Sequence, residues 1–206
     1  MRTRVSERTV LVVVGMPGAG KSLASGVAEK MSMPVFVSGD IIRAEAKRRK
    51  LALTRRNLGR LMLTLREEEG MAAVARRLVP ILRPRKERYV VYEGARNIEE
   101  IDELAENYQV VTVAIHASPQ SRFQRLLRRK RRDRPRNWND FLERDERELK
   151  VGVGKVIALA DRMIENEDSK QDLKRRMKRL LSTLLSQRRS ESLQRQRSAR
   201  RRTRTR

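Results

Sequence analysis

An unbroken apolar run, Val10–Val14, leads directly into the segment GMPGAGKS, residues Gly15–Ser22. The run predicts a buried strand, and the segment fits the pattern G-x-x-x-x-G-K-S of a phosphate-binding loop, or P-loop. Gly15, Gly18 and Gly20 let the backbone adopt positive φ angles and approach a ligand closely. Four fixed positions between a strand and a helix disfavour a chance glycine-rich turn. The chain must therefore place a strand, a tight loop and a helix in direct succession.

The backbone N–H groups of this loop, with the N-terminus of the following helix, form a positive nest for a phosphate chain. Lys21 is expected to reach the β- and γ-phosphates, and the Ser22 hydroxyl is expected to ligate Mg²⁺. We expect the nucleotide to be contacted by consecutive residues: Gly15, Met16, Pro17, Gly18, Ala19, Gly20, Lys21, Ser22 and Leu23. The sequence thus predicts ATP and Mg²⁺ as cofactors, and it contains no motif that would separate ATP from GTP.

A length of 206 residues allows one α/β domain with a substantial core and an appendage. The absence of cysteine excludes disulfides and thiolate metal sites, and it favours a reducing compartment. The apolar run before Gly15 is too short for the core of a signal peptide, and no stretch approaches a membrane span. We therefore expect a cytoplasmic protein that makes no contact with a membrane.

The chain is strongly basic, with 50 Lys and Arg against 26 Asp and Glu and a formal net charge of +24. Nine Arg and one Glu fall between Arg188 and Arg206, so a large positive surplus remains in the rest of the chain. Such a surplus attracts polyanions, which include nucleotides, nucleic acid and anionic surfaces. The alternative is an arginine-rich surface of the kind found in proteins from hot environments, where acidic residues complete ion-pair networks.

Apolar runs rich in β-branched residues predict five strands. They cover Thr9–Val14, Pro34–Val37, Tyr89–Tyr92, Val110–Ile115 and Arg162–Ile164. Apolar spacing and capping residues predict helices between them. These are Lys21–Met31, a long stretch Ile41–Leu82 with interruptions near Leu53–Thr54 and at Gly70, Ile98–Glu106, Pro119–Leu127, Asp140–Leu149 and Gln171–Leu185. The alternation predicts a three-layer α/β/α fold with a five-stranded parallel sheet, in which ligands bind beyond the carboxyl ends of the strands.

We expect residues 1–186 to form one domain, in which residues 41–88 are a helical insertion and residues 128–150 an arginine-rich lid. The residues expected to bound helices in the insertion are Thr54, as an N-cap, and Pro80 and Pro84, as terminators. Residues 187–206 contain almost no apolar residue. This basic tail therefore cannot bury enough surface to fold by itself.

The second predicted strand leads into the segment SGDIIR, residues 38–43. Asp40 at this strand end could hold a Mg²⁺-bound water or accept a proton from an attacking hydroxyl, so it is a candidate catalytic and acceptor-binding residue. Arg43 could bind an acceptor phosphate through its guanidinium fork. The alternative is that Asp40 only caps the next helix.

The third predicted strand leads into the segment EGAR, residues 93–96. Glu93 follows an apolar strand, which is the usual position of the second acid of a P-loop enzyme, and we expect it to hold the metal indirectly. Gly94 permits close approach of a ligand, and Arg96 offers another clamp for an acceptor phosphate. The alternative is a hairpin-like turn with a solvated arginine.

The fourth predicted strand leads to the single histidine, His116, for which we expect a structural role because nothing nearby completes a dyad or a metal set. Further on, Arg125 and Arg129 are four residues apart and share one helix face. Together with Arg144 they are candidate catalytic residues of a closing lid, since mobile arginines can neutralise the charge that develops in phosphoryl transfer. The alternatives are a solvated basic face and an RNA-binding patch.

The pairing of GMPGAGKS with SGDIIR and EGAR resembles the nucleoside monophosphate kinases, adenylate kinase above all, where the P-loop is followed by TGD-x-x-R and DG-x-P-R segments. Over residues 9 to about 185, the chain is also similar to an archaeal family of predicted nucleotide kinases described as dephospho-coenzyme A kinase-related. The segments that carry this likeness are LREEEG (Leu65–Gly70), AIHASP (Ala114–Pro119), RDERELKVGVGKVIALAD (Arg144–Asp161) and a terminal I-x-N (Ile164 to Asn166).

The resemblance implies a P-loop kinase that transfers the γ-phosphoryl group of ATP to a nucleoside monophosphate or a dephospho-coenzyme A-like acceptor. It implies that Arg43 and Arg96 hold the acceptor phosphate and that the arginines from Arg125 onward close over ATP. The chain departs from the pattern at Glu93, where Asp is usual, and at Ala95, where an aromatic residue is usual. A zinc lid is excluded because the chain has no cysteine.

A nucleic-acid-associated ATPase or switch is a second open function, in which the basic surface and tail hold RNA. The net charge favours it, whereas an aromatic content of 3%, with no aromatic residue in the tail, disfavours base stacking. A third alternative is that the tail only tethers an enzyme to acidic partners. The sequence carries no signal for an oligomeric state.

Overall fold

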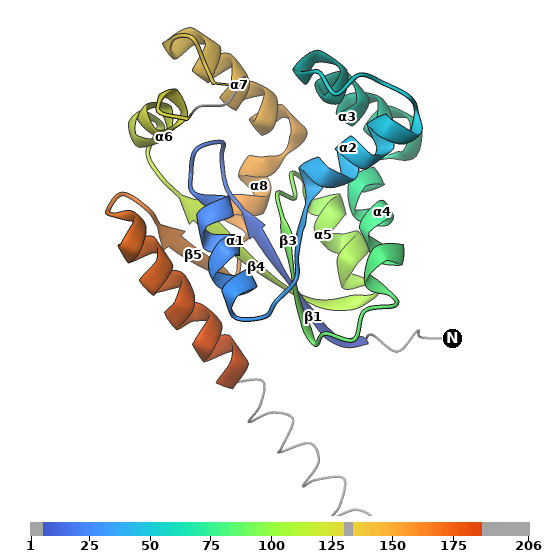
Figure 1. Ribbon diagram of the computed structural model, residues 1–206, viewed down its shortest axis with the longest axis vertical. Helices are drawn as coiled ribbons and strands as arrows, with labels where there is room; N and C mark the ends of the chain where they lie inside the picture. The colour runs from blue at the N-terminus through green and yellow to red at the C-terminus, as the bar shows by residue number, and fades with distance from the viewer. Residues whose placement is uncertain (1–5, 130–133, 187–206) are drawn as a thin grey trace, which may run out of the picture.

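The computed structural model describes residues 6–129 and 134–186. Its strands form one parallel sheet in the order β2-β3-β1-β4-β5 (Figure 1). The strands span Ser6–Val14 (β1), Val35–Val37 (β2), Tyr89–Glu93 (β3), Tyr108–His116 (β4) and Arg162–Glu165 (β5). The apolar run Val10–Val14 is completely buried in β1, as expected for the central strand of a parallel sheet that is covered on both faces. The predicted five-stranded parallel sheet is confirmed.

Helices connect these strands at every crossover that the structure describes. They span Lys21–Lys30 (α1), Ser38–Arg48 (α2), Arg55–Glu69 (α3), Ala73–Leu82 (α4), Ile98–Ala105 (α5), Pro119–Leu127 (α6), Trp138–Val151 (α7) and Val153–Ala158 (α8). A further helix covers residues 170–186 and packs against the sheet beside α1 (Figure 1). The predicted helix at residues 171–185 is therefore confirmed.

The sheet separates two apolar cores, because consecutive strand residues point to opposite faces. On one face, Leu11 and Val13 of β1 pack with α1 and the helix of residues 170–186. On the other face, Val10, Val12 and Val14 pack with α2, α3, α4, α5 and α8. The predicted three-layer α/β/α arrangement is thus confirmed (Figure 1).

Helices α2, α3 and α4 form an arm, residues 38–82, between β2 and β3 (Figure 1). A buried carboxylate attaches the arm to the sheet. Glu100 of α5 accepts hydrogen bonds from Arg66 of α3 at 2.7 Å and from the hydroxyl of Tyr92 in β3 at 2.6 Å. The side chains of Arg66 and Glu100 are 4% and 0% exposed, so the two charges compensate each other in a place that water does not reach.

Some predicted boundaries in the arm are confirmed and others are wrong. Thr54 caps α3 as predicted, because its side chain accepts a hydrogen bond from the backbone N–H of Asn57 at 3.2 Å. Helix α2 begins at Ser38 instead of Ile41, so the residue expected as its possible cap lies inside its first turn. Pro80 lies within α4 and does not end it, because the burial of Val79 and Leu82 compensates for the lost backbone hydrogen bond.

Three further findings concern a short helix, the absence of a membrane span in the described ranges, and the predicted segments that the structure does not describe. Helix α8 was not anticipated from the sequence; it is short and follows Gly152, whose φ of +111° ends α7. No helix within the described ranges is long and apolar enough to cross a membrane. The predicted tail, residues 187–206, lies outside the described residues, as do residues 130–133 of the predicted lid.

Candidate active site

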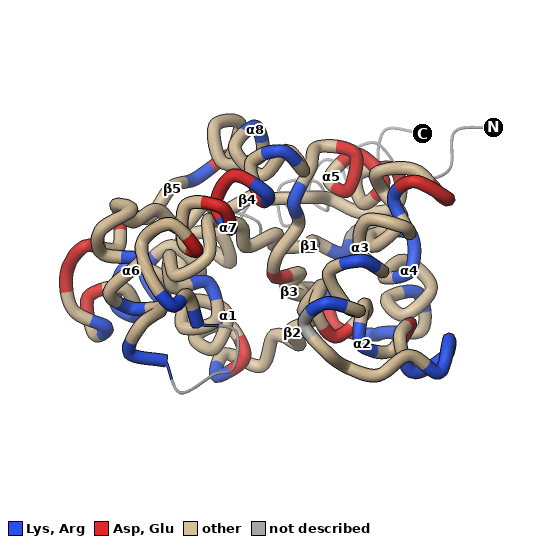
Figure 2. The backbone as a smooth tube through the Cα atoms, turned by 90° about the horizontal axis from the view of Figure 1, so that it is seen from above, with Lys and Arg blue, Asp and Glu red and all other residues tan. Residues whose placement is uncertain are grey.

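A cleft lies at the carboxyl ends of β1, β2 and β3, with the arm on one side and α6 and α7 on the other (Figures 1 and 2). Parallel strands end at the same edge of a sheet, so the loops that follow them meet there. Figure 2 looks onto this edge and shows Lys and Arg both in the arm and in the segments of α6 and α7. The charged residues that line the cleft are Lys21, Arg43, Glu93, Arg96, Arg129, Arg144 and Glu148.

The backbone of the P-loop explains its glycines. The φ angle is +147° at Gly15 and +84° at Gly18. A Cβ atom at Gly15 would lie 2.3 Å from the carbonyl oxygen of Ile115, and one at Gly18 would lie 2.7 Å from that of Arg122. Glycine is therefore needed at both positions, for its φ angle and for the close packing against β4 and α6.

Asn166, in the segment after β5, braces the P-loop. Its Nδ2 donates to the carbonyl oxygen of Ala19 at 2.7 Å, and its backbone N–H donates to the carbonyl oxygen of His116 at 2.7 Å. Asn166 is buried, whereas the His116 side chain is exposed. The terminal I-x-N segment thus positions the loop, and His116 takes part through its backbone, in keeping with the strand-end role expected of it.

Lys21, the first residue of α1, folds back over the loop. Its Nζ donates to the carbonyl oxygens of Gly15 at 2.7 Å and Met16 at 3.2 Å. Burial in the cleft, together with the positive charge of Arg96, lowers the pKa of Lys21 from 10.5 to about 8. A phosphate chain in the loop would replace the two carbonyl groups as the partner of the ammonium group.

The hydroxyl of Ser22 donates a hydrogen bond to Oε1 of Glu93 at 2.7 Å. Glu93 is the last residue of β3 and is 6% exposed, which places its carboxylate directly across from the start of α1. The two predicted metal-binding residues therefore lie together. Both offer hard oxygen ligands, which are the kind that Mg²⁺ prefers.

Arg96 and Glu148 form an ion pair in the cleft. Arg96 donates through Nε to Glu148 at 2.7 Å, and through Nη1 to the hydroxyl of Ser38 at 3.0 Å and the carbonyl oxygen of Gly94 at 3.1 Å. Although burial disfavours its charge, the Glu148 carboxylate raises the pKa of Arg96. Burial likewise opposes the Glu148 charge, but Arg96 and Lys21 hold the pKa of Glu148 below its ordinary value.

Arg43 and Asp40 lie in the first turns of α2 and pair with each other. Nη2 of Arg43 is 2.5 Å from Oδ1 of Asp40, and their side chains are 46% and 65% exposed. Arg43 lines the cleft, whereas Asp40 is not among the lining residues. The capping alternative for Asp40 is wrong, because Val37 is the N-cap and no side-chain cap bond is present in α2. The negative charge of Asp40 instead interacts favourably with the positive end of the helix dipole at the N-terminus of α2.

The three predicted lid arginines separate into two groups. Arg129, just after α6, and Arg144, in α7, both line the cleft. Arg125 does not; it donates to the backbone carbonyl oxygen of Asn166 at 2.6 Å, and its Nη1 is buried with no hydrogen-bond partner in the described chain. Arg125 and Arg129 were expected to act from one helix face, but Arg129 lines the cleft and Arg125 does not.

Glu148 is a site residue that motif comparison does not reveal. A signal for it exists in the pattern of α7, where buried positions recur with helical spacing at Phe141, Asp145 and Val151. An acid on such a face needs a buried cation as its partner. The sequence does not say which of its many arginines supplies that cation.

Comparisons with known proteins show which family the chain belongs to. The family described as an AAA domain matches residues 14–141. A UPF0200 protein of Hyperthermus butylicus is 43% identical over 167 residues, which cover 81% of this chain and 90% of that protein. A UPF0200 protein of Pyrococcus furiosus is 45% identical over 163 residues, covering 77% and 88% of the two chains.

Solved structures share the fold at low sequence identity. TT1252 from Thermus thermophilus has a TM-score of 0.65 and 20% identity, with 87% of this chain and 99% of that chain covered. Shikimate kinase from Bacteroides thetaiotaomicron has a TM-score of 0.60 and 17% identity, with 84% and 98% covered. The fold is that of P-loop kinases, and the sequence relatives are much closer. The P-loop falls within the AAA-domain match and lines the cleft. The chain is therefore a member of the UPF0200 family.

Proposed function

We propose that the protein is a Mg²⁺-dependent P-loop kinase that transfers the γ-phosphoryl group of ATP to a small phosphorylated acceptor. The observation that carries the proposal is the Ser22–Glu93 hydrogen bond of 2.7 Å beside Lys21, at the mouth of a glycine-rich loop. A hydroxyl, a carboxylate and an ammonium group in this arrangement match the needs of a metal–triphosphate complex. A nucleoside monophosphate and a dephospho-coenzyme A-like molecule are the two acceptor classes.

Ser22 and Glu93 are the residues that would hold Mg²⁺, the latter through bound water. No group of three or more His, Cys, Asp or Glu side chains within the described ranges could bind a metal by itself. Mg²⁺ usually keeps several waters and binds one or two protein oxygens with substrate phosphates, so a two-residue site fits this ion. When bound, it would neutralise charge on the phosphates.

The charges of the cleft favour an anionic acceptor. Its lining contains five cationic side chains, Lys21, Arg43, Arg96, Arg129 and Arg144, against two carboxylates. In this proposal Lys21 binds the nucleotide and Glu93 holds its metal, so neither is available to the acceptor. The four arginines remain, and guanidinium groups bind phosphate in a forked geometry. The acceptor would therefore carry at least one phosphate group.

The test is an assay of ADP formation with MgATP, in which each nucleoside monophosphate and dephospho-coenzyme A are supplied separately. The expected result is turnover that depends on one class of acceptor, with the phosphorylated product identified by mass spectrometry. ATP hydrolysis that ignores every acceptor would contradict the kinase assignment while leaving the nucleotide site intact.

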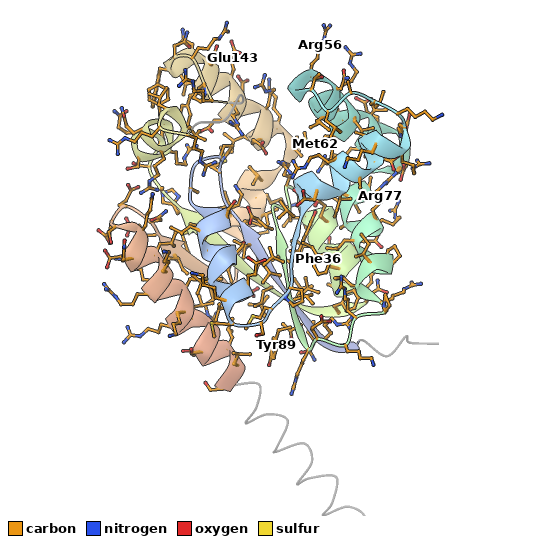
Figure 3. The ribbon with its side chains drawn as sticks, in the orientation of Figure 1. Phe36, Arg56, Met62, Arg77, Tyr89 and Glu143 are labelled. Carbon is orange, nitrogen blue, oxygen red and sulfur yellow. The ribbon has the colours of Figure 1, made fainter. Side chains whose placement is uncertain are left out.

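A second function, a nucleic-acid-associated ATPase, is favoured by one observation on the arm. Its inward cations are paired; Arg77, for example, contacts Glu69 at 2.6 Å. By contrast, four exposed cations form no ion pair with any residue in the described ranges: Lys47, Lys50, Arg56 and Arg60. Figure 3 shows Arg56 at the far end of α3, directed away from the sheet. Exposed cations on the arm that lack an ion-pair partner in the described ranges suit a phosphate backbone.

Charge-neutral variants separate this second function from non-specific attraction. Lys47→Gln with Lys50→Gln should weaken binding to a short single-stranded RNA and flatten its salt dependence. The matched control is Lys174→Gln with Lys178→Gln, two exposed lysines on the helix of residues 170–186. Equal losses in both variants would indicate a diffuse charge effect, and RNA-stimulated ATP hydrolysis would favour the ATPase over the kinase.

A further inference from the structure

Helix α7 carries two acidic side chains, Asp145 and Glu148, on the face that packs against the rest of the protein. Phe141, Asp145 and Val151 of this face are buried, and Glu148 lines the cleft. A carboxylate in a packed face is costly unless a cation compensates it. Each of these two carboxylates has an arginine as its partner, and the two arginines come from opposite sides of the cleft.

The first anchor joins α7 to the P-loop through Arg122 of α6. Arg122 donates to the two oxygens of Asp145 at 2.8 and 2.5 Å, and the side chains are 5% and 11% exposed. The same guanidinium donates to the carbonyl oxygens of Pro17 and Ala117, both at 3.2 Å, and lies 4.9 Å from the ring centroid of Phe141. Since Pro17 belongs to the P-loop, Asp145 directs a buried arginine onto the nucleotide-binding backbone.

The second anchor joins α7 to the arm through Arg96. Glu148 accepts from Arg96 at 2.7 Å, and Arg96 also donates to Ser38, the first residue of α2. Asp145 and Glu148 are one helical turn apart on the same face of α7. Movement of α7 away from the sheet would therefore separate a buried ion pair and a partly buried one at once.

We propose that α7 is a fixed brace of the P-loop and that Asp145 is a positioning residue for the nucleotide. Asp145 itself does not line the cleft. It acts through Arg122, which holds the Pro17 carbonyl and with it the loop whose N–H groups receive the phosphates. This differs from the expectation that residues 128–150 close as one lid. The inference rests on the proposed nucleotide site and needs no acceptor.

The test compares MgADP affinity by calorimetry in variants of α7. Asp145→Asn should weaken MgADP binding about tenfold, the effect of losing a charged hydrogen-bond partner, and Asp145→Glu should recover part of the loss. The matched control is Glu146→Gln, because Glu146 is exposed on the same helix and contacts Lys150. The control should bind MgADP as the unchanged protein does. An equal loss in the control, or no loss in Asp145→Asn, would overturn the positioning role.

A double variant keeps the test valid if Asp145→Asn unfolds the protein. Arg122→Met with Asp145→Leu replaces a buried ion pair by apolar side chains of similar size, a change that proteins often tolerate. This variant should melt near the temperature of the unchanged protein and still bind MgADP weakly, because the hydrogen bond to Pro17 is lost. Unchanged MgADP affinity in this variant would show that the pair serves stability alone.

Hydrogen exchange tests the fixed position of α7 without any ligand. The amides of α7 should exchange slowly already in the free protein, and MgADP should slow them by no more than about tenfold, the factor by which the brace favours its binding, while α7 stays in place. The single tryptophan, Trp138, packs against Phe123 and Phe141 with ring centroids 5.0 and 4.9 Å away, so its emission should also stay constant. Rapid exchange that slows on addition of MgADP would overturn the brace. Failure of the unchanged protein to bind MgADP would instead overturn the proposed function, and the ligand-free exchange rates would still decide about α7.

Discussion

On the P-loop side of the cleft, the groups expected to meet the nucleotide come mostly from consecutive residues, with Lys21 and Ser22 in succession, and the distant Glu93 joins them through a hydrogen bond to Ser22. On the arm side, Arg43 and Arg96 are each held by a carboxylate, and the partner of Arg96 lies 52 residues further along the chain. The P-loop side is therefore set mainly by local backbone geometry, whereas Arg96 on the arm side depends on an ion pair with a distant segment. The difference teaches that an arginine at a strand end is not a free phosphate clamp until its own partner is known.

The largest expected effect belongs to the P-loop side. Lys21→Ala should lower the rate of ADP formation by about a thousandfold or more, because an electrostatic contact to the transferred phosphoryl group is lost. Lys30→Ala, an exposed position at the end of the same helix, should keep its activity. Thermal unfolding of both variants shows that the fold persists. Full activity in Lys21→Ala would remove the P-loop side from the mechanism.

Asp40→Asn tests whether the arm side takes part in the chemistry. If Asp40 accepts a proton or orders the acceptor, kcat should fall about a hundredfold while the affinity for MgATP changes little. The exposed pair with Arg43 contributes little to stability, so the variant should remain folded. Unchanged turnover, measured at saturating substrates, would leave Asp40 with its helix-end role only.

Glu148→Gln tests whether the two sides act independently. Arg96 would lose its charged partner but keep its contacts to Ser38 and Gly94, so the KM for the acceptor should rise about tenfold. The KM for ATP should stay within about twofold, since Asp145 still holds the P-loop through Arg122. Steady-state kinetics with both substrates varied gives the two constants. A parallel rise in both would show that α7 couples the two sides of the cleft.

A smaller effect should appear in the pH dependence of nucleotide binding. With its pKa lowered to about 8, Lys21 loses its proton in the free protein as pH rises through that value, whereas a bound phosphate favours the charged form. The Kd for MgADP should therefore increase between pH 8 and pH 9.5 by roughly tenfold at most, because a pKa shift of one unit corresponds to tenfold. Lys21→Arg stays charged in this range, and its profile should be flat. A flat profile in the unchanged protein would contradict a lowered Lys21 pKa.

The fold and the P-loop side could be predicted from the sequence because their signals are local. An apolar run before a glycine-rich loop predicts a strand. Thr54 predicts the start of a helix, and α3 begins at the next residue, Arg55. The partners Arg96–Glu148 and Arg122–Asp145 could not be predicted, because a chain with 50 Lys and Arg offers many cations for each acid. Pairing depends on how α7 packs, and periodicity gives the buried face of a helix but not what it faces.

The attachment of the arm has a consequence for the order in which the chain folds during synthesis. Arg66 is buried against Glu100, which lies 34 residues further along the chain, and Tyr92 completes the contact from β3. A ribosome has therefore finished the whole arm before the counter-charge of Arg66 exists. Domains fold from segments that are already available, and an uncompensated charge resists burial. A nascent chain that stops before Glu100 therefore cannot bury Arg66 beside its counter-charge, so we expect the arm to complete its packing only after α5 has been made.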